Sequence, residues 1–299
     1  MVIGTGRHIP SKARAMAVVE RFFKGLSPSG FHRLRYFEWG ARDAEVVICV
    51  HGLTRNAHDF DRLADRLADR YRVVAVDVVG RGGSDWLTDP AHYTYAQYQA
   101  DMNALLARLD VERVHWIGTS MGGLIGMFWA ALPGTPIVSL LINDVGPFIP
   151  KAALQRIAAY LLDARFSSLQ ELERHLRTVL APFGPLRDED WAHLVRHGHR
   201  VLGDGSLALA YDPAIAENVK KEIADVNLWS FWDQVSCPTL VFRGAGSDLL
   251  SAETAREMKR RGPGARVVTF PGVGHAPALM ADDQIEIVAG WLASPGQAS

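Results

Sequence analysis

The chain has few cysteines and no excess of charge of either sign. Only two cysteines, Cys49 and Cys237, occur among its 299 residues, and each lies in or beside an apolar run. Without a Cys-x-x-Cys spacing, they are interpreted as small buried core residues and not as disulfide partners or metal ligands. Lys and Arg number 32 against 33 Asp and Glu, which gives a formal net charge of -1. This balance argues against nucleic acid or an anionic membrane surface as a partner.

Long apolar runs and nucleotide-binding motifs are missing as well. Residues 1–17 contain no continuous apolar stretch of the secretory type, and the most apolar helical stretch, 124–132, is too short to span a bilayer. We therefore expect a cytoplasmic protein. No Gly-x-Gly-x-x-Gly or Walker pattern occurs, so no nucleotide cofactor is expected. We expect no metal either, because His193, His197 and His199 lack the glutamate of an H-E-x-x-H pattern and are interpreted as solvated.

Short Val/Ile/Leu-rich runs alternate with amphipathic stretches along the rest of the chain. This alternation predicts an α/β fold with a mostly parallel sheet covered by helices. The expected strands are His32–Trp39, Val46–Val50, Arg72–Asp77, Arg113–Gly118, Val138–Asp144, Thr239–Arg243 and Arg266–Phe270. The expected helices between them are Ala57–Arg70, Tyr95–Leu109, Met121–Leu132, Ala252–Arg261 and Asp282–Leu292.

One segment interrupts this alternation. Between residues 147 and 234 the sequence predicts helices over Lys151–Asp163, Ser168–Leu180 and Arg187–Arg200, with little strand signal. We interpret 147–234 as a helical cap, and 1–146 together with 235–299 as the core that carries it.

The strongest functional signal is the sequence Gly118-Thr119-Ser120-Met121-Gly122. It follows a predicted strand and begins a predicted helix, as a G-x-S-x-G nucleophile elbow requires. The sharp turn presents the serine oxygen above the sheet edge, at a helix N-terminus whose backbone N–H groups favour a developing oxyanion. Ser120 is the predicted nucleophile.

A serine nucleophile needs a base and a carboxylate that orients the base. His275 follows the last predicted strand, in a loop with glycines on its N-terminal side. Asp248 follows the strand Thr239–Arg243, and the order Ser120, Asp248, His275 matches that of this enzyme class. Asp144 also ends a predicted strand and is the alternative acid. Asp248 is favoured because its loop directly precedes the strand that leads to His275.

The oxyanion hole requires two backbone donors. Met121 N–H follows the nucleophile, and Leu53 N–H lies in the His51-Gly52-Leu53 turn after the strand Val46–Val50. Possible substrate contacts are His51, Arg55, Trp191 and Tyr211. An arginine at the position of Arg55 is more often a surface or loop-anchoring residue, and packing of cap on core explains the aromatic residues equally well.

These motifs together resemble the α/β-hydrolase superfamily. The resemblance is carried by His51-Gly52, by the segment 77–85, by the elbow, by Asp248 and by Gly274-His275. It implies an eight-stranded, mostly parallel sheet, a helical cap inserted after the sixth strand, and no required metal or organic cofactor. The aspartate-dependent dehalogenases and epoxide hydrolases of this fold are excluded, because a serine occupies the position of their aspartate.

The resemblance implies a carboxylesterase-like serine hydrolase acting on small to medium esters, as a monomer or homodimer. Carbon–carbon bond hydrolysis of ring-cleavage diketones is an alternative, because those relatives share the Ser-x-Gly-Gly elbow, although Ala276-Pro277 replaces the aromatic residue that commonly follows their histidine. A non-catalytic ligand receptor is a third possibility.

Overall fold

The computed structural model describes residues 18–161, 163–221 and 223–296. Eight strands form one sheet in the order β1-β2-β4-β3-β5-β6-β12-β13. Their bounds are Val19–Ser27 (β1), Gly30–Trp39 (β2), Val46–Val50 (β3), Arg72–Val76 (β4), Val114–Thr119 (β5), Ile137–Asn143 (β6), Thr239–Gly244 (β12) and Arg266–Phe270 (β13). β2 pairs antiparallel with β1 and β4, and the remaining neighbours are parallel. The prediction of a mostly parallel eight-stranded sheet is confirmed.

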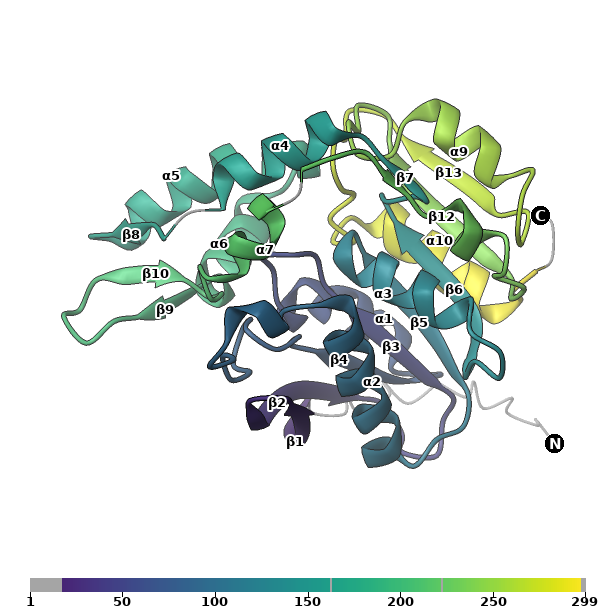
Figure 1. The fold of residues 1–299 in the computed structure, drawn as a ribbon, viewed down its shortest axis with the longest axis horizontal. Coiled ribbons are helices and arrows are strands. Elements are labelled where there is room, and N and C mark those ends of the chain that lie inside the picture. Colours follow the sequence, from purple (N-terminus) through teal and green to yellow (C-terminus); the bar gives the residue numbers. More distant parts are fainter. Residues whose placement is uncertain (1–17, 162, 222, 297–299) are drawn as a thin grey trace, which may run out of the picture.

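Helices cover both faces of this sheet (Figure 1). The first face packs against α2 (Tyr95–Leu109), α3 (Met121–Ala130) and α9 (Ala252–Met258), and the second against α1 (Asp61–Leu67) and α10 (Asp282–Ala293). Along β3, Val46, Ile48 and Val50 enter the first core cluster, whereas Val47 and Cys49 enter the second. Because both faces are buried, this strand is a continuous apolar run in the sequence.

The first strand, β1, was not expected from the sequence. It forms a hairpin with β2 in which Ser27 lies opposite Gly30. β1 is an edge strand, and only three of its nine residues are buried. Its apolar residues therefore follow no clear alternation, which is why the pattern does not stand out.

The insert (147–234) lies between β6 and β12 and extends beyond one end of the sheet (Figure 1). Its helices confirm the predicted helical character, but it also contains short strands that the sequence did not predict. Its elements are β7 (Phe148–Ile149), α4 (Lys151–Tyr160), β8 (Arg165–Phe166), α5 (Leu169–Val179), η3 (Ala181–Phe183), α6 (Asp188–His197), β9 (His199–Val201), β10 (Leu207–Leu209), α7 (Ile215–Lys221), β11 (Val226–Asn227) and α8 (Trp229–Trp232).

The insert packs partly on itself and partly on the core. Leu172, Trp191 and Leu194 form a separate cluster, whereas Ile157 of α4 and Ile215 of α7 join the main core cluster. The division into cap and core domains stays a prediction. None of the described helices is long and apolar enough to cross a membrane.

Candidate active site

Ser120 lies at the turn between β5 and α3. Its backbone φ of 51° is left-handed, a conformation that a non-glycine residue adopts only when its surroundings enforce it. The Ser120 N–H donates to the Asn143 carbonyl at 2.9 Å, which ties the turn to β6. The structure therefore forms the sharp strand-to-helix turn that the sequence predicted.

Two glycines let the elements around this turn approach closely. A Cβ on Gly118 would lie 2.2 Å from the backbone of Gly122, and one on Gly122 would lie 2.0 Å from the Val50 carbonyl oxygen. Neither position accommodates a side chain. Glycine is therefore required at both positions because α3 packs so closely on β5 and β3.

Ser120, His275 and Asp144 form a continuous hydrogen-bonded chain. His275 Nε2 lies 3.0 Å from Ser120 Oγ, and His275 Nδ1 lies 2.7 Å from Asp144 Oδ2. A carboxylate only accepts, so Nδ1 carries the proton that it donates to Asp144. Nε2 is then left with the lone pair that accepts the serine hydroxyl. This is the tautomer that a base for Ser120 requires.

Asp144 is completely buried, and its carboxylate accepts two further hydrogen bonds. Gly244 N–H donates to Oδ1 at 2.8 Å and Ser247 Oγ donates to Oδ2 at 2.6 Å. Both donors come from the end of β12 and the loop after it. With His275 they give the carboxylate three donors, which hold it in one orientation.

The prediction that Asp248 orients His275 is wrong in this structure. Asp248 instead forms an ion pair with Arg156 of α4, at 2.5 and 2.9 Å, and its side chain is 47% exposed. The loop after β12 turns Ser247 inward and Asp248 outward. The sequence order could not separate the two aspartates, because both lie between Ser120 and His275 and both follow strands of the sheet.

The loop that carries His275 is anchored by Asn143. Asn143 Nδ2 donates to the Pro277 carbonyl at 2.7 Å and to Thr119 Oγ1 at 3.1 Å. Asn143 directly precedes Asp144, and its buried side-chain amide thus connects this position to Thr119, which directly precedes Ser120, and to the loop after β13. The sequence analysis did not single it out.

The two expected oxyanion donors flank Ser120. Leu53 and Met121 both line the cavity that contains Ser120. Within the described ranges, neither backbone N–H donates a hydrogen bond to another group of the protein. Unpaired backbone donors beside a nucleophile are what an oxyanion hole requires.

A buried arginine positions the Leu53 turn. Arg81 has no exposed surface; its Nε donates to the Leu53 carbonyl at 2.9 Å and its Nη1 donates to Tyr98 Oη at 3.0 Å. Arg81 lies in the segment 77–85 that carries the family resemblance, but the sequence analysis gave it no role. Its guanidinium holds the carbonyl group of Leu53, a residue that lines the cavity.

His51 supports the same turn and was expected to contact substrate instead. It is completely buried; its Nε2 accepts the Val78 N–H at 3.0 Å and its Nδ1 donates to the Gly52 carbonyl at 2.7 Å. Burial lowers the pKa of His51 to about 4, so the imidazole is neutral.

The cavity at Ser120 has a volume of about 490 Å³ and lies between the core and the insert. This volume lies within the range of about 300–1,000 Å³ that is usual for small-molecule sites. No charged side chain is among the described residues that line it. These are Leu53, Tyr93, Thr94, Tyr95, Tyr98, Ser120, Met121, Leu124, Phe128, Val145, Ile149, Leu154, Ile157, Ile215, Asn218, Val219, Val226, Leu228 and Leu249.

None of the four expected substrate contacts lines this cavity. Arg55 pairs with Asp59 at 2.6 Å and, with Tyr211, lines a separate small hollow of about 20 Å³. Trp191 is buried in the insert's own cluster. Arg55 is therefore the loop anchor that was its alternative interpretation.

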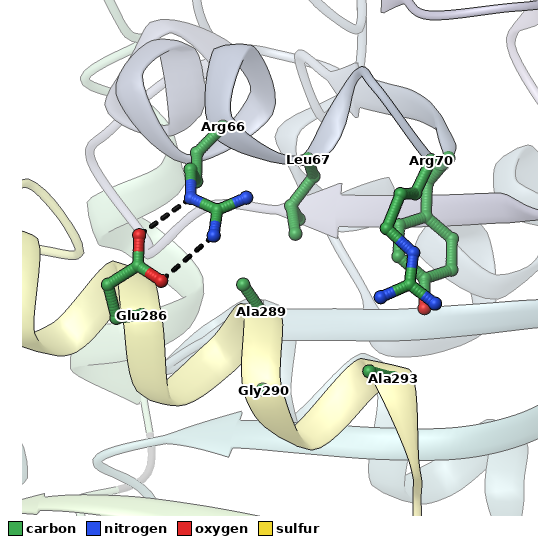
Figure 2. Close-up of a pocket in the computed structure, with 8 residues that line it drawn as sticks. Arg66, Leu67, Arg70, Glu286, Ala289, Gly290 and Ala293 are labelled. Carbon is green, nitrogen blue, oxygen red and sulfur yellow. Dashed lines mark hydrogen bonds and ion pairs between the residues drawn. The ribbon is translucent and has the colours of Figure 1, made fainter. Parts of the chain in front are cut away.

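A further hollow of about 240 Å³ lies on the opposite helical layer, between α1 and α10 (Figure 2). Arg66 and Glu286 bridge it with hydrogen bonds of 2.6 and 2.9 Å. It is lined by residues of the two helices and of the turn after α1, and Ser120, His275 and Asp144 are not among them. It is a helix–helix groove and not a second reaction site.

The comparisons with known proteins agree with this geometry. A model of the alpha/beta hydrolase family matches residues 47–289, and the chain belongs to that family. A 3-hydroxybutyrate-oligomer hydrolase from Cupriavidus necator is 45% identical over 277 residues, which cover 89% of this chain and 94% of that protein. A 2-(acetamidomethylene)succinate hydrolase from Mesorhizobium japonicum is 28% identical, covering 77% of this chain and 81% of that protein.

The structural comparison extends over nearly the whole chain. The crystal structure of a putative hydrolase from Rickettsia typhi has a TM-score of 0.87 and 33% identity, covering 93% of this chain and 99% of that one. The protein is therefore an α/β-hydrolase-fold enzyme, and its relatives support an ester-cleaving hydrolase.

Proposed function

We propose that this protein is a serine esterase that hydrolyses short oligomers of 3-hydroxybutyrate-type esters through an acyl-enzyme on Ser120. The observation that carries the proposal is the Ser120–His275–Asp144 hydrogen-bonded chain at the wall of an uncharged cavity. The 45% identity to a 3-hydroxybutyrate-oligomer hydrolase supports the substrate class. A short oxyester repeat is mostly uncharged, so it suits a cavity lined by apolar side chains.

The mechanism assigns one role to each group. His275 removes the Ser120 proton as the hydroxyl attacks the ester carbonyl, and Asp144 stabilises the imidazolium that forms. The N–H groups of Leu53 and Met121 bind the oxyanion. His275 then gives its proton to the leaving alcohol, and water activated by His275 hydrolyses the acyl-enzyme to the free acid and regenerates Ser120. The proposed reaction uses no metal or organic cofactor. We propose that the enzyme is cytoplasmic.

The test compares wild type with Ser120→Ala on three substrates: p-nitrophenyl butyrate, a linear 3-hydroxybutyrate trimer and a ring-cleavage diketone. We expect wild type to cleave both esters and Ser120→Ala to lose about a thousandfold or more of kcat, because the nucleophile is gone. Ser206→Ala, in the exposed turn between β9 and β10, is the matched control and should retain the parent rate. Thermal melting checks that both variants fold.

The outcomes separate the parts of the proposal. Turnover by Ser120→Ala at the parent rate would overturn the serine mechanism. Cleavage of p-nitrophenyl butyrate without any cleavage of the trimer would overturn the substrate class alone, and faster cleavage of the diketone would favour carbon–carbon hydrolysis. Labelling by a fluorophosphonate, mapped to Ser120 by mass spectrometry, is expected; its failure would favour a non-catalytic receptor.

A further inference from the structure

Three histidines and an aspartate meet where the insert touches the core, away from the triad. His193 and His197 are four residues apart on α6 (Asp188–His197), and His58 and Asp61 are three apart where η1 (Ala57–Phe60) meets α1. The His58 and His197 rings stack with centroids 3.8 Å apart, and the His193 and His197 rings lie 4.6 Å apart. The sequence showed only the α6 pair, because the other two residues are more than a hundred positions away.

The ligating atoms of this cluster converge. One ring nitrogen each of His58 and His197 and one carboxylate oxygen of Asp61 all lie within 4.8 Å of one another. His58 Nδ1 already approaches Asp61 Oδ2 at 3.0 Å, and His193 Nε2 lies 3.6 Å from the same oxygen. All four side chains are partly exposed, so an ion can reach them from solvent.

The interface that holds the cluster is well anchored. Asn56 Nδ2 donates to the His197 carbonyl at 2.8 Å, and His193 Nε2 lies 2.8 Å from the His58 carbonyl, to which it donates. These two bonds connect α6 to η1 on both sides of the stacked rings. The backbones that carry the ligands therefore need no rearrangement to bring them together.

We propose that His58, Asp61 and His197 form a binding site for a divalent transition-metal ion such as Zn²⁺. Imidazole and carboxylate are the ligand types that Zn²⁺ prefers when no thiolate is offered, and His58, His197 and Asp61 supply both types. Tetrahedral Zn²⁺ with ligands at about 2.0–2.1 Å needs neighbouring ligand atoms about 3.3 Å apart, and the three candidate atoms already lie within 4.8 Å of one another.

Neutral imidazoles are required for metal binding. His58 Nδ1 lies 3.0 Å from Asp61 Oδ2, and a bound ion would take the place of the hydrogen between these two atoms. Because His197 lies on α6 of the insert and His58 and Asp61 lie on the core, bound metal would link the insert to the core.

The test measures Zn²⁺ binding to untagged, chelator-treated full-length protein by calorimetric titration, without any turnover assay. Wild type should bind about one equivalent, and His58→Asn and His197→Asn should each weaken binding by about tenfold or more. His92→Asn is the matched control, because His92 lies 3.9 Å from Asp89 at the same three-residue spacing but contributes to no such cluster. His275→Asn should also bind about one equivalent of Zn²⁺.

Two further measurements keep the result interpretable. Saturating Zn²⁺ should raise the melting temperature of wild type and of His92→Asn but not of His197→Asn, because only an intact site binds the folded state preferentially. If His58→Asn does not fold, Asp61→Asn and His197→Asn carry the same comparison from two different elements. Absence of binding by wild type, unchanged binding in the cluster variants, or loss only in His275→Asn would each overturn the proposal.

Discussion

The assignment of the triad acid gives the sharpest prediction, and it concerns Asp144→Asn. Asp144 Oδ1 accepts the Gly244 N–H, and Oδ2 accepts both Ser247 Oγ and His275 Nδ1. An asparagine has one acceptor oxygen and one amino group. The Gly244 N–H is a fixed backbone donor, so it will take the oxygen, and the amino group will face His275.

An amino group in that place forces the wrong histidine tautomer. His275 Nδ1 must then accept, its proton moves to Nε2, and Nε2 no longer accepts the Ser120 hydroxyl. The same substitution in serine proteases lowers kcat by about 10⁴, and we expect a loss of about 10³–10⁴ here. That loss corresponds to about 4–5.5 kcal/mol of barrier. The KM should change little, since Asp144 does not line the cavity.

The matched variant is Asp248→Asn. It removes one partner of the ion pair between Arg156 and Asp248, whose side chains are 37% and 47% exposed respectively. Ion pairs as exposed as this one stabilise a fold by only about 0–1 kcal/mol. We therefore expect kcat close to that of wild type. Initial rates on p-nitrophenyl butyrate, with unfolding curves for both variants, provide the measurement. A greater loss of kcat in Asp248→Asn than in Asp144→Asn would refute the reasoning.

Two further predictions concern the buried groups behind the Leu53 turn. Arg81→Met removes the guanidinium that holds the Leu53 carbonyl, so kcat should fall by about 10–100-fold while KM changes by much less. The reason is that a mispositioned oxyanion donor affects mainly the transition state. A comparable rise in KM with unchanged kcat would contradict this role. The folded-state pKa of His51, about 4, lies below its unfolded value of 6.5. As the pH falls, the unfolded chain therefore takes up the proton before the folded protein does. The free energy of unfolding should fall by about 3 kcal/mol as the pH drops from about 6.5 to 4. His51→Gln keeps an acceptor for the Val78 N–H but removes this titration, so urea unfolding at several pH values should show a shallower decline; parallel pH profiles would contradict the prediction.

The sequence predicted the parts of the site that are specified locally. The sequence predicts Ser120 as the nucleophile because its turn demands glycines at fixed offsets, and these glycines are visible in a single sequence. His275 and Leu53 were identified because each follows a strand at the edge where such folds place their ligands. Each of these assignments depends on neighbours within a few residues along the chain.

The parts that were missed depend on contacts between distant segments. Whether Asp144 or Asp248 reaches His275 is decided by how the loop after β12 turns, and no local pattern encodes that turn. His58 and His197 stack although 139 positions separate them, so the sequence analysis saw only the half of the cluster that lies on α6. Arg81 looks like an ordinary charged residue until its burial is known.

The arrangement separates the reacting groups from the walls that select a substrate. Ser120, Asp144 and His275 all lie in or directly after turns at the carboxyl ends of core strands, and the bonds that orient them, from Asn143 and Ser247, also come from core segments. Much of the cavity wall, by contrast, comes from the insert, through β7, α4, α7 and β11. A change in the insert can therefore reshape the cavity while the hydrogen-bonded chain stays intact. This is a physical reason why proteins of one fold can differ in the substrates their names describe, and why the identity of the substrate has to be sought in the insert and not in the triad.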